Sequence, residues 1–321
     1  MPIYLPIGLG AGLAAAVLFA SASTGPLVTR FLLFFLASLP AFLAGLGWGW
    51  RASLVAAVAG TALAAVISGN FAALVYGLSQ GAPVVLLSYL AYLNRPAPEG
   101  SGGTVEWYPI GRLVIWATGM AGALSVLSLS VIGADMQVLR TGLKTFIERT
   151  ISSELPQLGG KSLEPAQLEA LTDIALYLLP AASAVSWLAG LLFNLWLAGR
   201  ITLASGRLLR PWPDLAALSF PSGTALGLAA ATGATFLSGF AGLAAAGFVG
   251  ALFMAYMLLG LAIVHYVTRG RSWRPFVLFA VYAALMVLNP WSGLGLVLMA
   301  LTEPFAPWRR RAPPLPGGPA T

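Results

Sequence analysis

The chain has 321 residues, of which 59% are apolar and only 8% are charged, and its mean hydropathy is +0.87. Soluble proteins carry about 25% charged residues, so most of this chain cannot face water. Soluble enzymes, nucleic-acid-binding modules and disordered proteins are therefore excluded, and a multi-spanning helical membrane protein remains. The absence of cysteine excludes disulfides and thiolate-bound metals.

The net charge of +7 comes almost entirely from arginine, which lies in short loops between apolar runs. Such arginines act as topology determinants and contact anionic headgroups, so we expect the lipid bilayer and no nucleic acid as partner. Abundant arginine, alanine and glycine are typical of bacteria with high-GC genomes, and the start of the chain lacks the charged region of a signal peptide. We therefore expect a multi-pass protein of the bacterial cytoplasmic (inner) membrane.

Charge-free windows predict the membrane spans, because a helix needs about 20 residues to cross about 30 Å of hydrocarbon. The windows predict one span in 1–29, one in 31–50, two in 52–94, one in 113–134, one in 174–199 and two in 215–268. We expect a kink at Pro40 and turns near Ser68-Gly69-Asn70 and Ser238-Gly239. That makes eight full spans.

The last window, 275–302, is interrupted by Asn289-Pro290 and fits either one kinked helix or two short helices. Two short helices are favoured, because they keep Arg309, Arg310 and Arg311 on the same side as most loop arginines. The predicted fold is thus an all-α polytopic transmembrane bundle of 8–10 membrane helices, eight full spans plus a broken or paired short C-terminal segment. Residues 1–305 form one membrane domain with both termini in the cytoplasm, and residues 306–321 form a basic, Pro/Gly-rich disordered tail.

A hydrophilic insertion at 134–172 interrupts the apolar pattern. Its first part predicts an amphipathic helix on the outer membrane surface, because apolar and charged residues alternate at helical spacing. The apolar face has Met136, Leu139, Leu143, Phe146 and Ile147, and the charged face has Arg140, Lys144 and Glu148. Residues 155–163 predict a loop, and Pro165 fits the first turn of the next helix. A lid over the bundle and a plain connector both remain open, with the connector favoured.

Small residues recur at every fourth position in four of the predicted spans. The ladders are Gly8, Gly12, Ala16 and Ala20; Ala56, Gly60, Ala64 and Ser68; Gly223, Gly227, Ala231, Thr235 and Gly239; and Gly242, Ala246 and Gly250. Helices in lipid associate where small side chains let backbones approach closely, so we interpret all four ladders as packing faces of a compact bundle.

The chemistry of a catalytic site is absent from the sequence. The spans carry no ionisable residue at mid-membrane except Glu303 near the end of the last helix, and the single histidine, His265, lies beside Arg269 at a helix end. Arg210-Pro211 and Pro221-Ser222-Gly223 imitate part of a lipid-phosphatase pattern, but Thr224 stands where that chemistry needs a histidine. We expect no enzyme, no cofactor and no metal.

Four polar residues are candidate intramembrane contacts, and six residues form a candidate docking loop. The first set, which either packs helices or contacts a solute, is Asn70, Gln80, Asn194 and Asn289. The second is Arg200, Ser205, Arg207, Arg210, Trp212 and Asp214. Arginine offers a planar fork of donors for phosphate or carboxylate, indoles anchor the interface, and Pro211 and Pro213 stiffen the loop. Asp214 is placed either to cap the next helix or to pair with an arginine. The alternative is that these arginines only enforce topology.

Four segments resemble the YybS-like family of uncharacterised bacterial membrane proteins. They are LAGLGWG at 43–49, WYPIGR at 107–112, NLWLAGR at 194–200 and SGRLLRPWPD at 205–214. The first half of that family is similar to the substrate-binding S-components of energy-coupling-factor transporters. The resemblance implies solute binding and a coupling face on the first helix at Ala11 and Ala15 or at Ala16 and Ala20. It departs in size, because an S-component has six spans.

Two functions therefore remain open. The first is a transport-type protein that binds a small solute, as yet unidentified, within the bundle. The second is a non-catalytic structural or docking component that binds other membrane subunits. A polar cavity formed by Asn70, Gln80, Ser88, Asn194 and Asn289 would favour transport, and an apolar, filled centre would favour docking.

Overall fold

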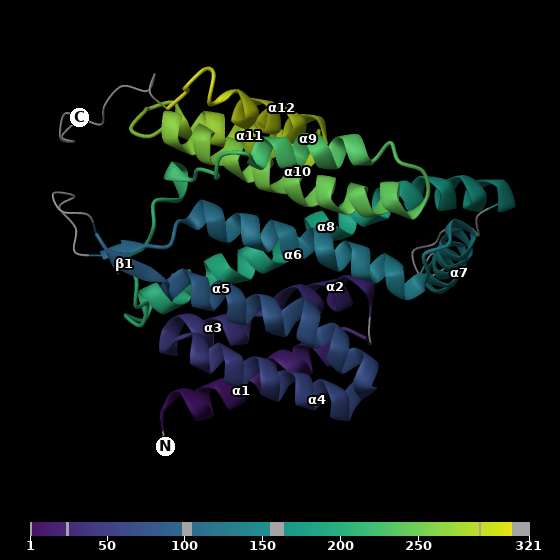
Figure 1. Ribbon diagram of the computed structural model, residues 1–321, viewed down its shortest axis with the longest axis horizontal. Coiled ribbons are helices and arrows are strands. Elements are labelled where there is room, and N and C mark those ends of the chain that lie inside the picture. The colour runs from purple at the N-terminus through teal and green to yellow at the C-terminus, as the bar shows by residue number, and fades with distance from the viewer. Residues whose placement is uncertain (1, 24–25, 98–104, 155–163, 289, 310–321) are drawn as a thin grey trace.

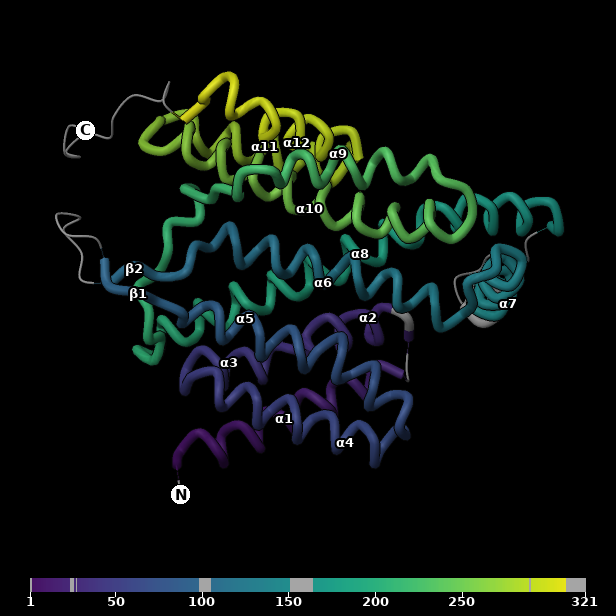
Figure 2. The backbone as a smooth tube through the Cα atoms, viewed as in Figure 1, coloured from purple at the N-terminus to yellow at the C-terminus, as the bar shows by residue number. Residues whose placement is uncertain are grey.

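Helices that lie side by side along one long axis account for most of the molecule (Figure 1). In this computed structural model, residues 2–23, 26–97, 105–154, 164–288 and 290–309 are described. Predictions for Asn289, for the loop at 155–163 and for the tail from 310 onward lie outside these residues. The tube in Figure 2 follows the chain back and forth between the two ends of the bundle.

The first apolar windows form six consecutive helical elements. They are α1 (Tyr4–Ser21), α2 (Leu27–Leu36), α3 (Leu39–Trp48), α4 (Trp50–Tyr76), the π-helical turn η1 (Gly77–Gly81) and α5 (Ala82–Tyr92). The predicted kink at Pro40 is confirmed, because the second window breaks between α2 and α3 and Pro40 lies in the first turn of α3. Proline fits there because the first turn needs no backbone N–H donor.

The window at 52–94 folds back on itself at Gly69, as the sequence predicts. Gly69 has φ of 87°, a left-handed conformation that glycine adopts without a steric penalty. The two arms then pack against each other: a Cβ on Gly60 would lie 2.3 Å from Tyr76 Oη, and one on Gly81 would lie 3.3 Å from Ala57 Cβ. Trp50–Tyr92 is therefore a helical hairpin.

A short antiparallel hairpin joins α5 to the next helix. Its strands are β1 (Asn94–Pro96) and β2 (Val105–Trp107), with Asn94 opposite Trp107 and Arg95 opposite Glu106. The sequence did not predict these strands, because three residues are too few for a periodic pattern. The chain then enters α6 (Ile110–Ile132), whose start is set by Pro109.

The hydrophilic insertion begins with α7 (Met136–Glu154), which runs across one end of the bundle (Figure 1). The predicted amphipathic helix is confirmed, but Leu139 and Leu143 are buried against Leu176 and Leu243 of neighbouring helices, while Phe146 is 63% exposed. The long helix α8 (Pro165–Ala204) follows, with Pro165 in its first turn as predicted and a capping box between Glu164 and Gln167. Part of the apolar face of α7, at Leu139 and Leu143, thus packs on protein.

The C-terminal part contains η3 (Leu215–Ala217, a 3-10 turn), α9 (Thr224–Ala234), α10 (Phe240–Val267), α11 (Arg274–Val287) and α12 (Trp291–Thr302). The predicted turn near Ser238-Gly239 is confirmed, because Gly239 lies between α9 and α10 with φ of 71°. Two short helices in the last window are confirmed, because α11 ends at Val287 and α12 begins at Trp291. The first span expected in 215–268 corresponds to α9, which begins after Gly223 at φ of 92° and has only 11 residues.

Six segments of the described chain are long and apolar enough to cross a membrane, namely 4–21, 28–48, 50–92, 110–132, 165–204 and 240–267. α9, α11 and α12 are shorter apolar helices. An all-α membrane bundle is therefore observed, and the exact count of eight full spans stays a prediction. The core is apolar: α3, α5, α6 and α8 meet around fully buried Phe42, Val84, Leu87, Ala117 and Leu188.

Candidate functional site

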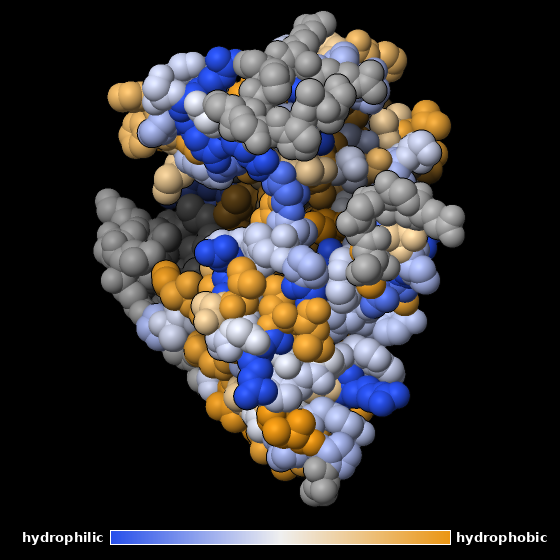
Figure 3. All heavy atoms as spheres, turned by 90° about the vertical axis from the view of Figure 1, so that its left-hand side faces the viewer, coloured by the Kyte–Doolittle hydropathy of each residue, from blue (hydrophilic) through white to orange (hydrophobic). Residues whose placement is uncertain are grey.

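Arginines gather at one end of the bundle, which we call the arginine end. It carries the start of α1, the β1–β2 hairpin, the segment between α8 and η3 and the last described residues (left in Figure 1). The starts of α4 and α6, the end of α8 and the turn between α10 and α11 lie there as well. The arginines of this end are Arg51, Arg95, Arg112, Arg200, Arg207, Arg210, Arg269, Arg271, Arg274 and Arg309. Figure 3 looks onto this end, where hydrophilic residues gather among apolar ones. The opposite end carries α7 and the start of α2.

Each of the three arginines of the predicted docking loop lies over a tryptophan ring. The guanidinium carbon of Arg200 is 5.2 Å from the centroid of the Trp212 ring, and the guanidinium carbon of Arg207 is 5.2 Å from the centroid of the Trp48 ring. The carbon of Arg210 is 5.6 Å from Trp107. A cation within about 6 Å of an indole face is attracted by the ring quadrupole, with about 0.5–1 kcal/mol at exposed sites. The loop is thereby attached to α3 and to β2.

The loop is shaped by close packing at its start. A Cβ on Gly199 would lie 3.0 Å from Trp212 Cζ3, so the glycine makes room for the indole. The backbone N–H groups of Arg207 and Leu208 both donate to the carbonyl oxygen of Thr202, at 2.8 and 3.1 Å. The Ser205 hydroxyl group lies 2.9 Å from the carbonyl oxygen of Ile201. These contacts close the end of α8 and fix the direction of the loop.

Arg210 and Asp214 are engaged within the chain. Arg210 Nη1 donates to the carbonyl oxygen of Ala91 at 3.0 Å, and burial lowers the pKa of the Arg210 guanidinium. Asp214 realises both predicted roles: it accepts from the Ala216 backbone N–H at 3.1 Å and pairs with Arg269 at 2.6 and 2.9 Å. The Arg269 hydrogen bonds lower the pKa of Asp214. None of the three predicted loop arginines has a carboxylate partner in the described part of the chain, and Arg200 and Arg207 also lack the backbone carbonyl acceptor that Arg210 has.

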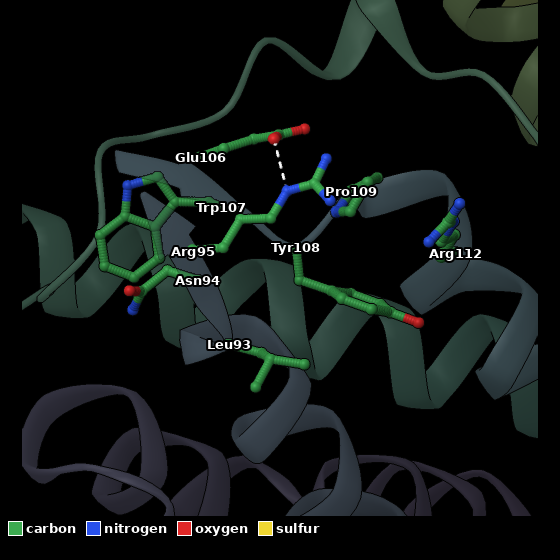
Figure 4. Close-up of a pocket in the computed structure, with 8 residues that line it drawn as sticks. All are labelled: Leu93, Asn94, Arg95, Glu106, Trp107, Tyr108, Pro109 and Arg112. Carbon is green, nitrogen blue, oxygen red and sulfur yellow. Dashed lines mark hydrogen bonds and ion pairs between the residues drawn. The ribbon is translucent and has the colours of Figure 1, made fainter. Parts of the chain in front are cut away.

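A hollow of about 330 Å³ lies beside the hairpin (Figure 4). Arg95 Nε donates to Glu106 at 2.7 Å across the strands, and this bond lowers the pKa of Glu106. Tyr108 extends toward Arg112, which has no carboxylate within 4 Å in the described residues and lies at the far side of the hollow from Trp107. Sequence reasoning did not single out these residues as a site, although the motif at 107–112 had marked the segment.

A second hollow, of about 370 Å³, opens between α1, α3 and α8. We call it the apolar crevice. Ile7, Ala11 and Leu43 line its wall, and Trp48, Ser205 and Arg207 lie at the arginine end. Arg207 therefore turns toward this crevice, while Arg200 stacks on Trp212 elsewhere on the loop.

The candidate intramembrane residues do not meet. Asn70 is exposed beside the turn at Gly69, and Gln80 is buried in η1. Asn194 is fully buried and its Nδ2 donates to the carbonyl oxygens of Phe35 and Gly190, which ties α8 to α2. Ser88 packs against Gly45 of α3. Within the described residues, no hydrogen bond joins any two of them, and Asn289 lies outside that part.

The coupling face implied for the first helix is partly buried in the chain itself. Ala15 and Ala16 are both 0% exposed, and Ala15 lies in a cluster with Ala64 and Tyr76. Ala15 therefore packs on the hairpin of Trp50–Tyr92.

Comparisons with known proteins identify a family and no individual relative. No curated protein and no solved structure matches the chain. The YybS-like name and the similarity to S-components thus remain resemblances. Residues 13–299 match the family described as Predicted membrane protein (DUF2232), and with most of its length matched the chain belongs to this family of membrane proteins.

Proposed function

We propose that the protein is a non-catalytic docking component of a membrane protein complex, and that its arginine end binds an acidic segment of a partner protein. The observation that carries the proposal is the Arg200–Trp212 stack, in which a guanidinium is held in place without a carboxylate partner among the described residues. Arg112 at the hairpin hollow is likewise free of a carboxylate there. Guanidinium groups in fixed positions are suited to bidentate binding of carboxylates.

The alternative that these arginines only set topology requires charge but no particular shape. The seating of Trp212 over Gly199 and the closure of the loop onto Thr202 supply shape. The first feature fixes the indole on which Arg200 stacks, and the second fixes the direction of the loop at Arg207. A surface that is ordered before binding loses less entropy when a partner docks.

The transport alternative is less supported. Transport requires polar side chains that converge on one cavity. The described candidates contact different helices instead, and the core between the helices is apolar. We therefore place solute transport second.

The orientation belongs to the same proposal. The bacterial cytoplasmic membrane is its setting, and the positive-inside rule puts the arginine end, with both chain termini, in the cytoplasm. The opposite end carries fewer basic residues, at Arg30 and on α7. A reporter fused after residue 321 should be active only in the cytoplasm, and activity only outside would contradict this orientation.

The docking test uses a photoreactive amino acid at Leu209, a side chain that is 61% exposed on the loop. A matched control carries it at Val131, 65% exposed at the opposite end of α6. We expect one specific protein to crosslink at Leu209 and not at Val131. Arg200→Glu with Arg112→Glu should abolish the crosslink at normal abundance of the variant.

Reversing the charges on the partner protein is the decisive experiment. Acidic residues of the crosslinked protein, changed to arginine, should restore the crosslink to the Arg200→Glu, Arg112→Glu variant. If the double variant crosslinks like the unmodified protein, or if Leu209 captures no protein, docking at the arginine end is wrong.

A further inference from the structure

The apolar crevice between α1, α3 and α8 is a site that the docking proposal does not use. Its wall consists of apolar side chains, among them Ile7, Ala11 and Leu43. Its volume of about 370 Å³ lies in the range of small-molecule sites, about 300–1,000 Å³. In a bilayer, an apolar opening between helices is in contact with acyl chains.

Polar groups occur only at the arginine end of the crevice. Arg207 lies there with its guanidinium over Trp48, which fixes the plane of the cation but leaves its N–H edge free for an acceptor. Ser205 lies beside it. No carboxylate of the described residues pairs with Arg207, so the positive charge is not neutralised by the chain there.

Trp48 adds an independent observation. Its indole Nε1 is buried and has no acceptor in the described part of the protein. A buried indole N–H normally finds a hydrogen-bond partner, because burial without one costs about 1–3 kcal/mol. An acceptor oxygen supplied from outside the chain would satisfy it, and Trp48 is itself one of the residues that line the crevice.

We infer that the crevice binds an anionic phospholipid of the surrounding bilayer. One acyl chain lies along Ile7, Ala11 and Leu43, and the phosphate group binds the guanidinium edge of Arg207. Basic pockets between membrane helices bind anionic headgroups in this way, because the ion pair forms at headgroup depth beside an apolar wall. A free phosphate would use Arg207 but would leave the wall empty. The inference stands apart from the proposed function, since it needs no partner protein.

The test is native mass spectrometry of the full chain extracted in mild detergent, with phosphatidylglycerol or phosphatidylcholine of the same chain length added. We expect the unmodified protein to retain one phosphatidylglycerol with about tenfold preference, equal to about 1.4 kcal/mol. Arg207→Gln should remove the preference. Arg200→Gln is the matched control, because it loses an indole-stacked arginine of the same loop that does not line the crevice.

Two further variants separate the parts of the site. Ala11→Phe fills the wall and should lower phosphatidylglycerol retention with Arg207 intact, and Leu43→Trp does the same if Ala11→Phe fails to fold. Trp48→Phe keeps an aromatic face for Arg207 and removes the Nε1 donor, so retention should fall about threefold to tenfold.

The outcomes are distinct. Equal retention of the two lipids, or an equal loss in Arg207→Gln and Arg200→Gln, would overturn the site. Displacement of the lipid by millimolar inorganic phosphate, with no effect of the filled wall, would show a soluble anion in place of a lipid and would also overturn it. Neither result bears on crosslinking at Leu209.

Discussion

Two helices of this protein carry the same ladder of small residues and use it differently. On α1, a Cβ at Gly8 would lie 2.6 Å from the Ala52 carbonyl oxygen, and one at Gly12 would lie 2.4 Å from that of Ala56. On α9, a Cβ at Gly227 would have no atom of another part of the chain within 4 Å, and none of the residues of the helix is fully buried. Glycine at every fourth position therefore permits close packing, but a neighbouring backbone must be present to use it.

The other two ladders, on α4 and α10, pack closely like that of α1. Ala56 and Ala64 of α4 are fully buried, and Gly250 of α10 faces the Ala181 carbonyl oxygen at 2.4 Å from a built Cβ. The prediction that all four ladders pack the bundle is thus confirmed for three and wrong for α9. That helix packs instead through Leu228, on the cluster around Tyr256 of α10. The segment before it is attached by the Asp214–Arg269 pair and by Arg309 Nη2, which donates to the Leu218 carbonyl oxygen at 2.8 Å.

The largest effect is expected for Gly12→Val. The new side chain would collide with the α4 backbone, so the two helices must separate, and overpacking of this kind costs about 3 kcal/mol of unfolding free energy. Titration with a denaturing detergent, followed by circular dichroism, measures the loss. Gly10→Val is the control, because nothing lies within 4 Å of Gly10, and it should change the free energy by less than about 0.5 kcal/mol. Equal effects of the two variants would contradict backbone contact at α1.

A second prediction tests whether the other C-terminal helices pack as loosely as α9. Gly260 of α10 packs on α12, where a Cβ would lie 2.3 Å from the Leu296 carbonyl oxygen. Gly260→Val should cost about 2 kcal/mol, less than Gly12→Val because the short α12 can shift outward. Gly295→Val, with no atom within 4 Å, is the control on the partner helix. If Gly260→Val leaves the free energy of unfolding unchanged, α12 packs as loosely as α9.

A third prediction concerns the polar attachment before α9. Asp214→Asn should lower stability by about 0.5 kcal/mol, a small figure because both side chains of the pair are over a third exposed. The folded pKa of Asp214 is lowered, so its contribution is present above the unfolded pKa of about 3.9 and is lost as pH falls through the folded value.

Limited proteolysis of the 218–223 segment is the measurement for Asp214. Cleavage should be faster in Asp214→Asn than in the unmodified protein at pH 7, and the difference should shrink below about pH 4. Arg269→Gln should match Asp214→Asn, and the double variant should add little. Additive effects would show that the pair does not hold the segment.

The smallest effect is expected for Gly227→Val. With open space around this glycine, the variant should change the unfolding free energy of the isolated chain by less than about 0.5 kcal/mol. The same assay as for Gly12→Val measures it. A loss above 1 kcal/mol would break the comparison, because the ladder of α9 would then have to pack against something.

The sequence alone determined the features that depend on a local property and on a bilayer of known thickness. Charge-free windows located the long helices, because hydrocarbon excludes charge wherever the chain crosses. Small and polar residues within the windows predicted the turns at Gly69 and Gly239. The interruption at Asn289-Pro290 and the positions of the arginines predicted the paired C-terminal helices. The periodicity of α7 was likewise visible, since a helix repeats its faces within the same 19 residues.

Only the tertiary structure decided which residues meet. Arg210 on Ala91, Asp214 on Arg269 and Asn194 on Phe35 join positions 119, 55 and 159 residues apart. Nothing in the local pattern distinguishes Gly12 from Gly227, or the Arg207 that lines a crevice from the Arg210 that binds a carbonyl. Close packing in a membrane depends on the shape of the neighbouring helix, and that neighbour is set by the whole bundle.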